Sequence, residues 1–190
     1  KTAAVMDPFK LATDLLFHCH EKGMQIFDRT NITSIQHQKG KIIAHTDSKF
    51  AITADHIIHC TGYESTETLK EKVVDLKSTY ALASESVPDL PALLKNAVIW
   101  DTSSPYYYYR ATSDNRIIMG GGDEEFKDPK KRDKLIPKKE VYLLKNFTKR
   151  FPDINFKLDY SWAGTFGETK DGLPYFGKPD PEKNEHYVLG

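Results

Sequence analysis

The chain has 190 residues, of which 39% are hydrophobic, and its 27 basic and 27 acidic residues balance. This length allows one large domain or parts of two, and the balanced charge gives no overall field that would favour nucleic acid or an anionic membrane. Cys19 and Cys60 lack the spacing of a disulfide scaffold or a metal site, which predicts free thiols in a reducing compartment. Because no apolar run approaches the roughly 20 residues of a membrane span, we expect a cytoplasmic protein.

The first sixty residues predict one helix followed by short strands. Asp7-Pro8 is typical of a helix start, apolar residues then recur at helical spacing, and Gly23 is the expected stop. Strands are predicted at residues 24–27, 32–37, 41–46 and 50–53. The run His56–Cys60 does not alternate, which is typical of a strand buried on both faces.

A polar stretch at residues 63–77, with a short helix at 66–72, is interpreted as a linker between two domains. Three antiparallel strands are predicted beyond it, at residues 97–101, 106–111 and 116–121, with Gly120–Gly122 at the end of the sheet.

Residues 126–139 are rich in lysine but also contain Asp128 and Asp133, which favours a solvated loop over a phosphate or nucleic-acid site. Residues 137–151 predict a helix that covers the sheet. Its buried face is expected to hold Val141, Leu144 and either Phe147 or Thr148.

Tyr160–Gly177 is the most distinctive stretch of the sequence. It contains four glycines, and glycine in a strand usually allows another group to approach the backbone closely. On spacing alone, it predicts two short strands joined by a turn at Lys170–Gly172.

Within that stretch, Trp-Ala-Gly at 162–164 and Thr-Lys-Asp-Gly-Leu-Pro-Tyr-Phe-Gly at 169–177 resemble the FAD-dependent amine and amino-acid oxidoreductases. This superfamily includes D-amino-acid oxidase, glycine oxidase and sarcosine oxidase. The order of helix, strand, β-meander and buried strand ending in Cys60-Thr61-Gly62 also resembles the way these enzymes complete their FAD domain.

The resemblance implies a mixed α+β and α/β fold. A partial FAD-binding domain would occupy residues 1–77, and an antiparallel substrate-domain sheet covered by a helix would occupy 78–168. Residues 169–190 would return to the FAD-binding domain. Since the N-terminal Gly-x-Gly-x-x-Gly that holds the pyrophosphate is not in this sequence, we expect a fragment that is inactive alone.

The resemblance also implies a cofactor, FAD, and residues that contact it. The backbone of Ile32 would face the adenine, and Cys60, Thr61 and Gly62 would lie near the dinucleotide. Phe166 and Gly172 would lie beside the flavin. The alternatives are a core strand residue for Ile32 and a simple loop start for Gly62.

Tyr106–Tyr109 and Arg110 lie on one predicted strand, so alternate rings point to opposite faces. The resemblance implies that Tyr106 and Tyr108 line the pocket of a small-molecule amine or amino-acid substrate and that Arg110 binds an anionic group. The alternatives are core packing and a structural ion pair. No side chain need act as a strong base, because hydride passes from the carbon bearing nitrogen to the flavin. No metal is expected, because the adjacent side chains of His18-Cys19-His20 diverge on a helix.

Three features depart from the superfamily pattern. Phe166 stands where glycine oxidase and D-amino-acid oxidase place a carboxylate-binding arginine, and Ile118 stands where sarcosine oxidase has an oxygen-activating lysine. No cysteine lies near the distinctive stretch to tether the flavin, so FAD is expected to be noncovalent. Two other functions remain open: a dehydrogenase of the same architecture that uses an electron carrier, and a noncatalytic binding or scaffolding domain.

Overall fold

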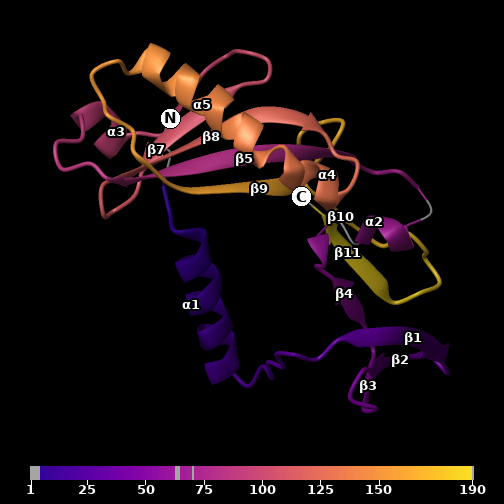
Figure 1. The fold of residues 1–190 in the computed structure, drawn as a ribbon. Coiled ribbons are helices and arrows are strands. Elements are labelled where there is room, and N and C mark those ends of the chain that lie inside the picture. Colours follow the sequence, from indigo (N-terminus) through magenta and orange to yellow (C-terminus); the bar gives the residue numbers. More distant parts are fainter. Residues whose placement is uncertain (1–4, 63–64, 70, 190) are drawn as a thin grey trace. The chain divides into compact units, whose positions relative to one another are not determined.

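The computed structural model describes residues 5–62, 65–69 and 71–189 (Figure 1). The chain forms two compact units, and each is described by itself. The first comprises the chain up to Cys60 together with Phe176–Val188, and the second comprises Thr61–Tyr175 together with Leu189. The sheets are largely antiparallel and the fold is mixed α/β, as predicted. The domain boundaries expected at residues 77 and 168 stay predictions, while the compact units change over at residues 60 and 175.

Helix α1 (Pro8–Glu21) of the first unit begins and ends as the sequence predicts. The Asp7 side chain accepts a hydrogen bond from the backbone N–H of Lys10 at 3.0 Å, and Pro8 occupies the first turn, where its missing N–H costs nothing. Gly23 follows the helix in the left-handed conformation that stops it. Residues 24–27 form no strand, contrary to the prediction, because they pair with no other strand among the described residues.

The first unit contains two three-stranded sheets. One is an antiparallel meander of β1 (Ile32–Gln38), β2 (Lys41–Thr46) and β3 (Ala51–Ala54). The other has the order β10-β11-β4, with β4 (Ile57–His59), β10 (Tyr175–Gly177) and β11 (Glu185–Leu189). Strand β11 runs parallel to β4. The expectation that β4 is buried on both faces is wrong for the described residues: it is an edge strand, and Ile58 is 62% exposed.

A carboxylate from β11 ties both sheets of the first unit together. Glu185 Oε1 lies 2.6 Å from Nε2 of His37 on β1, and its Oε2 lies 3.0 Å from Nε2 of His59 on β4. Burial raises the pKa of Glu185, but the hydrogen bonds from His37 and His59 outweigh that effect and hold the pKa below its usual range.

The second unit is organised around a five-stranded antiparallel sheet with the order β6-β7-β8-β5-β9. Its strands are β5 (Asp75–Ser86), β6 (Ile99–Trp100), β7 (Tyr107–Ala111), β8 (Arg116–Glu125) and β9 (Leu158–Glu168). Gly120–Gly122 lie within β8 and do not end it, which corrects the prediction. Two short helices accompany the sheet, α2 (Ser65–Thr68) and α3 (Ala92–Asn96). Residue 70 of the helix predicted at 66–72 lies outside the described residues.

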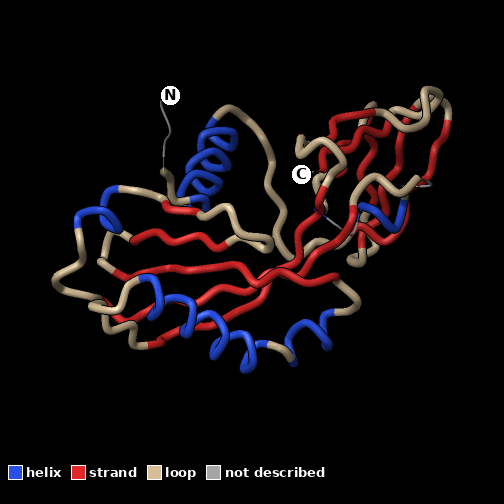
Figure 2. The backbone as a smooth tube through the Cα atoms, turned by 90° about the horizontal axis from the view of Figure 1, so that it is seen from above, coloured by secondary structure: helices blue, strands red, loops and turns tan. Residues whose placement is uncertain are grey.

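Helices α4 (Pro129–Lys134) and α5 (Ile136–Arg150) lie along one face of this sheet (Figure 2). The core beneath α5 contains Leu143 and Phe147, both 0% exposed, packed with Tyr80, Tyr109 and Met119. Each such apolar side chain contributes about 1.5–3 kcal/mol when it is removed from water. The predicted buried face is therefore wrong at Val141, which is 70% exposed.

The buried face of α5 differs from the predicted one because it includes a lysine. Lys139 is 8% exposed, one turn before Leu143. Its Nζ donates to the backbone carbonyl of Gly122 at 2.5 Å and lies 2.7 Å from Glu124 Oε1. Lys139 thus fixes α5 to the glycine-rich part of β8.

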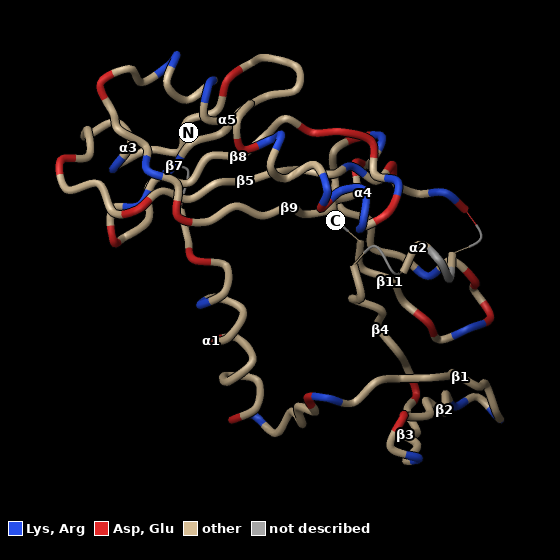
Figure 3. Tube along the Cα trace, viewed as in Figure 1, with Lys and Arg blue, Asp and Glu red and all other residues tan. Residues whose placement is uncertain are grey.

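The lysine-rich segment between β8 and α5 is a helix and not a loop, which is a correction. Asp128 accepts a hydrogen bond from the Lys131 backbone N–H at 2.8 Å and caps α4, and Pro129 follows it. Figure 3 shows that acidic residues accompany the basic ones around α4. Asp133, for example, lies 2.8 Å from Arg132 Nε. Local charge pairing explains this segment without a nucleic-acid partner.

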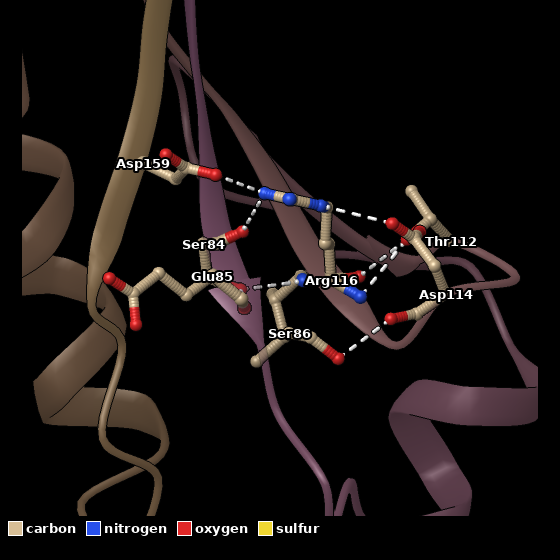
Figure 4. Close-up of polar contacts among 8 residues, drawn as sticks. Ser84, Glu85, Ser86, Thr112, Asp114, Arg116 and Asp159 are labelled. Atoms are coloured by element: carbon tan, nitrogen blue, oxygen red, sulfur yellow. Dashed lines mark hydrogen bonds and ion pairs between the residues drawn. The ribbon is translucent and has the colours of Figure 1, made fainter.

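Arg116 of β8 links its own strand to β5, to β9 and to the turn between β7 and β8 (Figure 4). Its guanidinium donates to the Ser84 carbonyl on β5 at 3.0 Å, to Asp114 in the β7–β8 turn at 3.0 Å, and to Asp159 on β9. The guanidinium also lies 5.5 Å from the ring centre of Tyr160. This arginine is structural, since its hydrogen bonds are directed to the protein itself.

Among the described residues, no helix is both long and apolar enough to cross a membrane.

Candidate active site

The tyrosine-rich strand β7 divides its side chains between the two faces of the sheet. Tyr107 and Tyr109 point toward α5, where they contact Tyr142 and Phe147. By strand alternation, Tyr108 and Arg110 lie on the opposite face. Tyr106, just before the strand, lies with its ring centre 6.4 Å from that of Tyr108. The structure therefore brings together the three residues for which a substrate role was predicted.

On that face, large aromatic residues belong to β7 and β9, and the small residues Gly120 and Ala81 lie between them on β8 and β5. One row across the sheet pairs Tyr108 with Gly120, Gly120 with Ala81, and Ala81 with Trp162. The next row places Thr79 opposite Gly164. We call this surface the aromatic face; its aromatic residues are Tyr106, Tyr108, Tyr160, Trp162 and Phe166. Tyr106 is 46% and Trp162 is 43% exposed, so apolar rings are available for contact.

Arg110 lies two residues after Tyr108 on β7, so it belongs to the same face of the sheet. It makes no ion pair or hydrogen bond with any described residue, so the predicted alternative of a structural ion pair finds no partner there. Its charge lowers the pKa of Tyr108, although burial and the charge of Asp123 raise that pKa more and leave it above the usual range. A guanidinium that no described residue pairs with, on the same face as phenol groups, is suited to binding a carboxylate.

Asp123 is a candidate site residue that the sequence did not reveal. Its Oδ1 atom is buried and has no hydrogen-bond partner among the described residues. Burial raises the pKa of Asp123 above its usual range, and the Thr79 hydroxyl and the charge of Lys139 offset part of that shift. The signal that could have identified it is the carboxyl directly after three glycines, within a strand that was expected to end.

The two positions that depart from the superfamily pattern also lie on the sheet. Ile118 of β8 pairs with Arg110 on one side and Ala83 on the other. Phe166 of β9 pairs with Lys77 of β5, at the edge opposite to β7. An isoleucine therefore occupies the row of Arg110.

The residues expected to contact FAD are divided between the units. Ile32, at the start of β1, and Cys60 belong to the first unit, whereas Thr61, Gly62, Phe166 and Gly172 belong to the second. Thr61 Oγ1 lies 2.8 Å from Ser65 Oγ. The structure thus does not bring these six residues together within one unit, and their roles stay predictions.

The fold defined by these units is that of a flavin-dependent oxidoreductase. The whole chain, residues 1–190, matches the family described as FAD dependent oxidoreductase (DAO), and the protein belongs to that family. No curated protein sequence matches the chain.

Solved structures with a similar fold include L-proline dehydrogenase from P. horikoshii, at 18% identity and a TM-score of 0.78, covering 97% of this chain and 50% of that one. Glycine oxidase from Geobacillus kaustophilus is also 18% identical, with a TM-score of 0.75 and coverages of 95% and 47%. L-alpha-glycerophosphate oxidase from Mycoplasma pneumoniae, solved with FAD bound, is 15% identical, with a TM-score of 0.74 and coverages of 97% and 51%. The chain spans about half the length of these proteins.

Two features of the described residues fit the cofactor that the family uses. Gly62 and Gly172 have φ angles of 61° and 71°, and nothing lies within 4 Å of where a Cβ atom would be. Both therefore leave backbone accessible to a ligand in a conformation that other residues rarely adopt. The aromatic face offers planar side chains suited to a ring system. Both described cysteines are free thiols, and neither lies near the aromatic face in sequence.

Proposed function

We propose that this chain supplies the substrate-facing sheet and part of the FAD domain of an enzyme that oxidises the C–N bond of an amine or amino acid. The observation that carries the proposal is that Arg110, which has no ion pair or hydrogen bond with any described residue, shares the aromatic face with Tyr106 and Tyr108. The names of two structural neighbours, a proline dehydrogenase and a glycine oxidase, support a small amino acid as substrate class.

FAD, when bound, would supply the hydride-accepting chemistry for oxidation at the carbon that bears nitrogen. Arg110 binds the substrate carboxylate as a charge-assisted hydrogen-bond donor. The hydroxyl groups of Tyr106 and Tyr108 orient the amine, and Trp162 excludes water from the apolar part of the substrate. Phe166, at the opposite edge of the sheet, contributes apolar surface and no charge.

A dehydrogenase that passes electrons to a carrier is the second candidate, and Ile118 favours it. Rapid reaction with oxygen is promoted by a cation near the flavin, and the row of the sheet that contains Arg110 holds Ile118 instead of a lysine. The two enzymes are separated by oxygen uptake: the holoenzyme of an oxidase consumes oxygen with its amine, whereas a dehydrogenase needs an artificial acceptor dye.

The first test is to express the complete polypeptide that contains this chain beside the 190-residue chain, and to incubate each with FAD before desalting. We expect a flavin absorbance spectrum in the complete polypeptide alone, since the pyrophosphate-binding motif is not among these 190 residues. Turnover of proline, glycine or an N-methyl amino acid then identifies the substrate class. Absence of flavin from both proteins would replace this proposal with the noncatalytic domain.

A further inference from the structure

Two histidines of the first unit face each other where β4 pairs with β11. His56 lies just before β4, and His186 is the second residue of β11 and pairs with Ile58. Because His56 precedes Ile58 by two residues, alternation places it on the same face as His186. The Nδ1 atom of His56 lies 3.4 Å from the Nε2 atom of His186, and the ring centres are 5.5 Å apart. Two imidazoles from separate strands are thus held side by side.

The separation of these two nitrogens fits a shared metal ion better than a hydrogen bond. Hydrogen bonds donated by nitrogen typically span about 2.7–3.2 Å, so a separation of 3.4 Å is long. Histidine nitrogens bind Zn²⁺ at about 2.0–2.1 Å, and two such ligands at the tetrahedral angle are therefore about 3.3–3.4 Å apart. Small rotations of the rings about their Cβ–Cγ bonds, a torsion with broad minima, aim both lone pairs at one point beside the pair.

Both imidazoles are available to an ion from solvent. His56 is exposed and His186 is half-buried. Neither ring has an ion pair or a second hydrogen bond with any described residue. The carboxylate of the adjacent Asp55 lies 2.5 Å from the Nζ atom of Lys41 and is engaged there. The two ring nitrogens that face each other therefore have no stronger partner among the described residues.

Two histidines on the opposite face of β4 and on β1 are arranged differently. The Nε2 atoms of His37 and His59 lie 2.6 Å and 3.0 Å from the two carboxylate oxygens of Glu185. A ring nitrogen that donates a hydrogen to a carboxylate has no lone pair left for an ion. The nitrogens that can act as ligands are thus those of His56 and His186.

We propose that His56 and His186 bind a divalent transition-metal ion of the Zn²⁺ type, with water completing its coordination. Imidazole nitrogen is a preferred ligand of Zn²⁺. No group of three or more histidine, cysteine or acidic side chains among the described residues is placed to hold an ion, so the protein supplies two ligands. The ion joins β11 to β4 in addition to their backbone pairing. Because the two ligands lie 130 residues apart, no motif spacing in the sequence indicates the site.

This inference does not rest on the proposed oxidation chemistry, and calorimetric titration with Zn²⁺ tests it directly. The complete polypeptide is expressed without a histidine tag. We expect the wild type to bind one more equivalent of Zn²⁺ than His56→Gln or His186→Gln, because each variant loses one of the two ligands. The exposed His18→Gln, on α1, is the matched control and should bind as the wild type does. Equal binding by the wild type and both site variants would overturn the proposal.

The effect of Zn²⁺ on stability tests whether the ion joins the two strands. A ligand that binds the folded state raises the temperature of unfolding. Zn²⁺ should therefore raise the unfolding midpoint of the wild type and of His18→Gln, and the rise should be lost in His186→Gln. The same midpoint with and without Zn²⁺ in the wild type would contradict a metal tie between β4 and β11.

A third measurement uses the wild type alone, so it does not depend on how the variants fold. Diethyl pyrocarbonate modifies histidines that have a free ring nitrogen, and peptide mass spectrometry gives the rate at each residue. Zn²⁺ should slow the modification of His56 and His186 and leave that of His18 unchanged, and a chelator should restore the original rates. Unchanged rates at His56 and His186 would show that the two rings share only a hydrogen bond.

Discussion

The ring of Tyr108 lies directly over Gly120 of the neighbouring strand, where a Cβ atom on residue 120 would overlap the ring carbons and the hydroxyl oxygen. The orientation of this tyrosine therefore depends on a missing methyl group. Gly120→Ala should displace the ring and destabilise the second unit by about 1–3 kcal/mol. Gly164→Ala is the control, since its Cβ would meet Thr79 Cγ2 at an ordinary 3.6 Å. Urea unfolding of both variants checks the prediction, and equal effects would contradict it.

The hydroxyl groups of Tyr106 and Tyr108 are predicted to act on substrate. In the complete holoenzyme, Tyr106→Phe and Tyr108→Phe should each lower kcat/KM by roughly 10-fold, the effect of one lost hydrogen bond to a charged or polar group. Tyr109→Phe is the matched control, because Tyr109 is buried against α5 on the other face. Unchanged kinetics in both site variants would remove these tyrosines from the pocket.

Arg110 is predicted to bind a substrate carboxylate. Arg110→Gln should raise KM by about 10–100-fold for amino-acid substrates, because a charge-assisted hydrogen bond contributes about 1.5–3 kcal/mol. Amines that lack a carboxylate should be affected little. Steady-state kinetics with a matched pair, such as an amino acid and its decarboxylated amine, measures the difference. Equal KM changes for both substrates would contradict carboxylate binding.

The rotation of α5 gives a stability prediction. Phe147 is fully buried between Tyr109, Phe151 and Phe156, whereas Val141 is exposed. Phe147→Ala should lower the free energy of unfolding by about 3–5 kcal/mol, and Val141→Ala by less than about 0.5 kcal/mol. Chemical denaturation followed by circular dichroism compares them. A larger loss at residue 141 would support the face predicted from the sequence.

Glu185 makes the stability of the first unit depend on pH. Its pKa in the folded protein is lower than in the unfolded chain, so its stabilisation is complete above the unfolded pKa of about 4.3 and is lost as the pH falls through the folded pKa. Glu185→Gln should therefore destabilise the protein at pH 7, by about 1 kcal/mol after screening by solvent. The difference should shrink below about pH 4. Denaturation of wild type, Glu185→Gln and the exposed control Glu182→Gln at both pH values measures it.

Much of the fold could be predicted from local sequence patterns. The cap at Asp7, the proline after it and the left-handed Gly23 are determined by neighbouring residues, so the start and end of α1 could be predicted. The period of two along a strand likewise suffices to separate Tyr108 from Tyr107 and Tyr109, and β7 confirms that division.

The errors arise where tertiary contacts override local pattern. Lysine is rarely buried, so the sequence gives no reason to place Lys139 in the core, yet the Gly122 carbonyl and Glu124 provide its partners. Both partners lie in the part of β8 beyond residue 121, where the glycine run had predicted the end of the strand. The same extension places Asp123 on the sheet, so the position of this carboxyl could not be inferred from sequence spacing.

The pairing of β4 with β11 joins residues 128 positions apart, as Ile57 and Glu185 are. A ribosome therefore makes residues 61–175 of the second unit before it makes the strand that pairs with β4 of the first unit. Residues 61–175 are continuous in the second unit, so its five-stranded sheet can form while the edge of β4 in the first unit is still unpaired. Until β11 is made, the edge of β4 that pairs with it offers unpaired backbone groups beside the exposed side chain of Ile58.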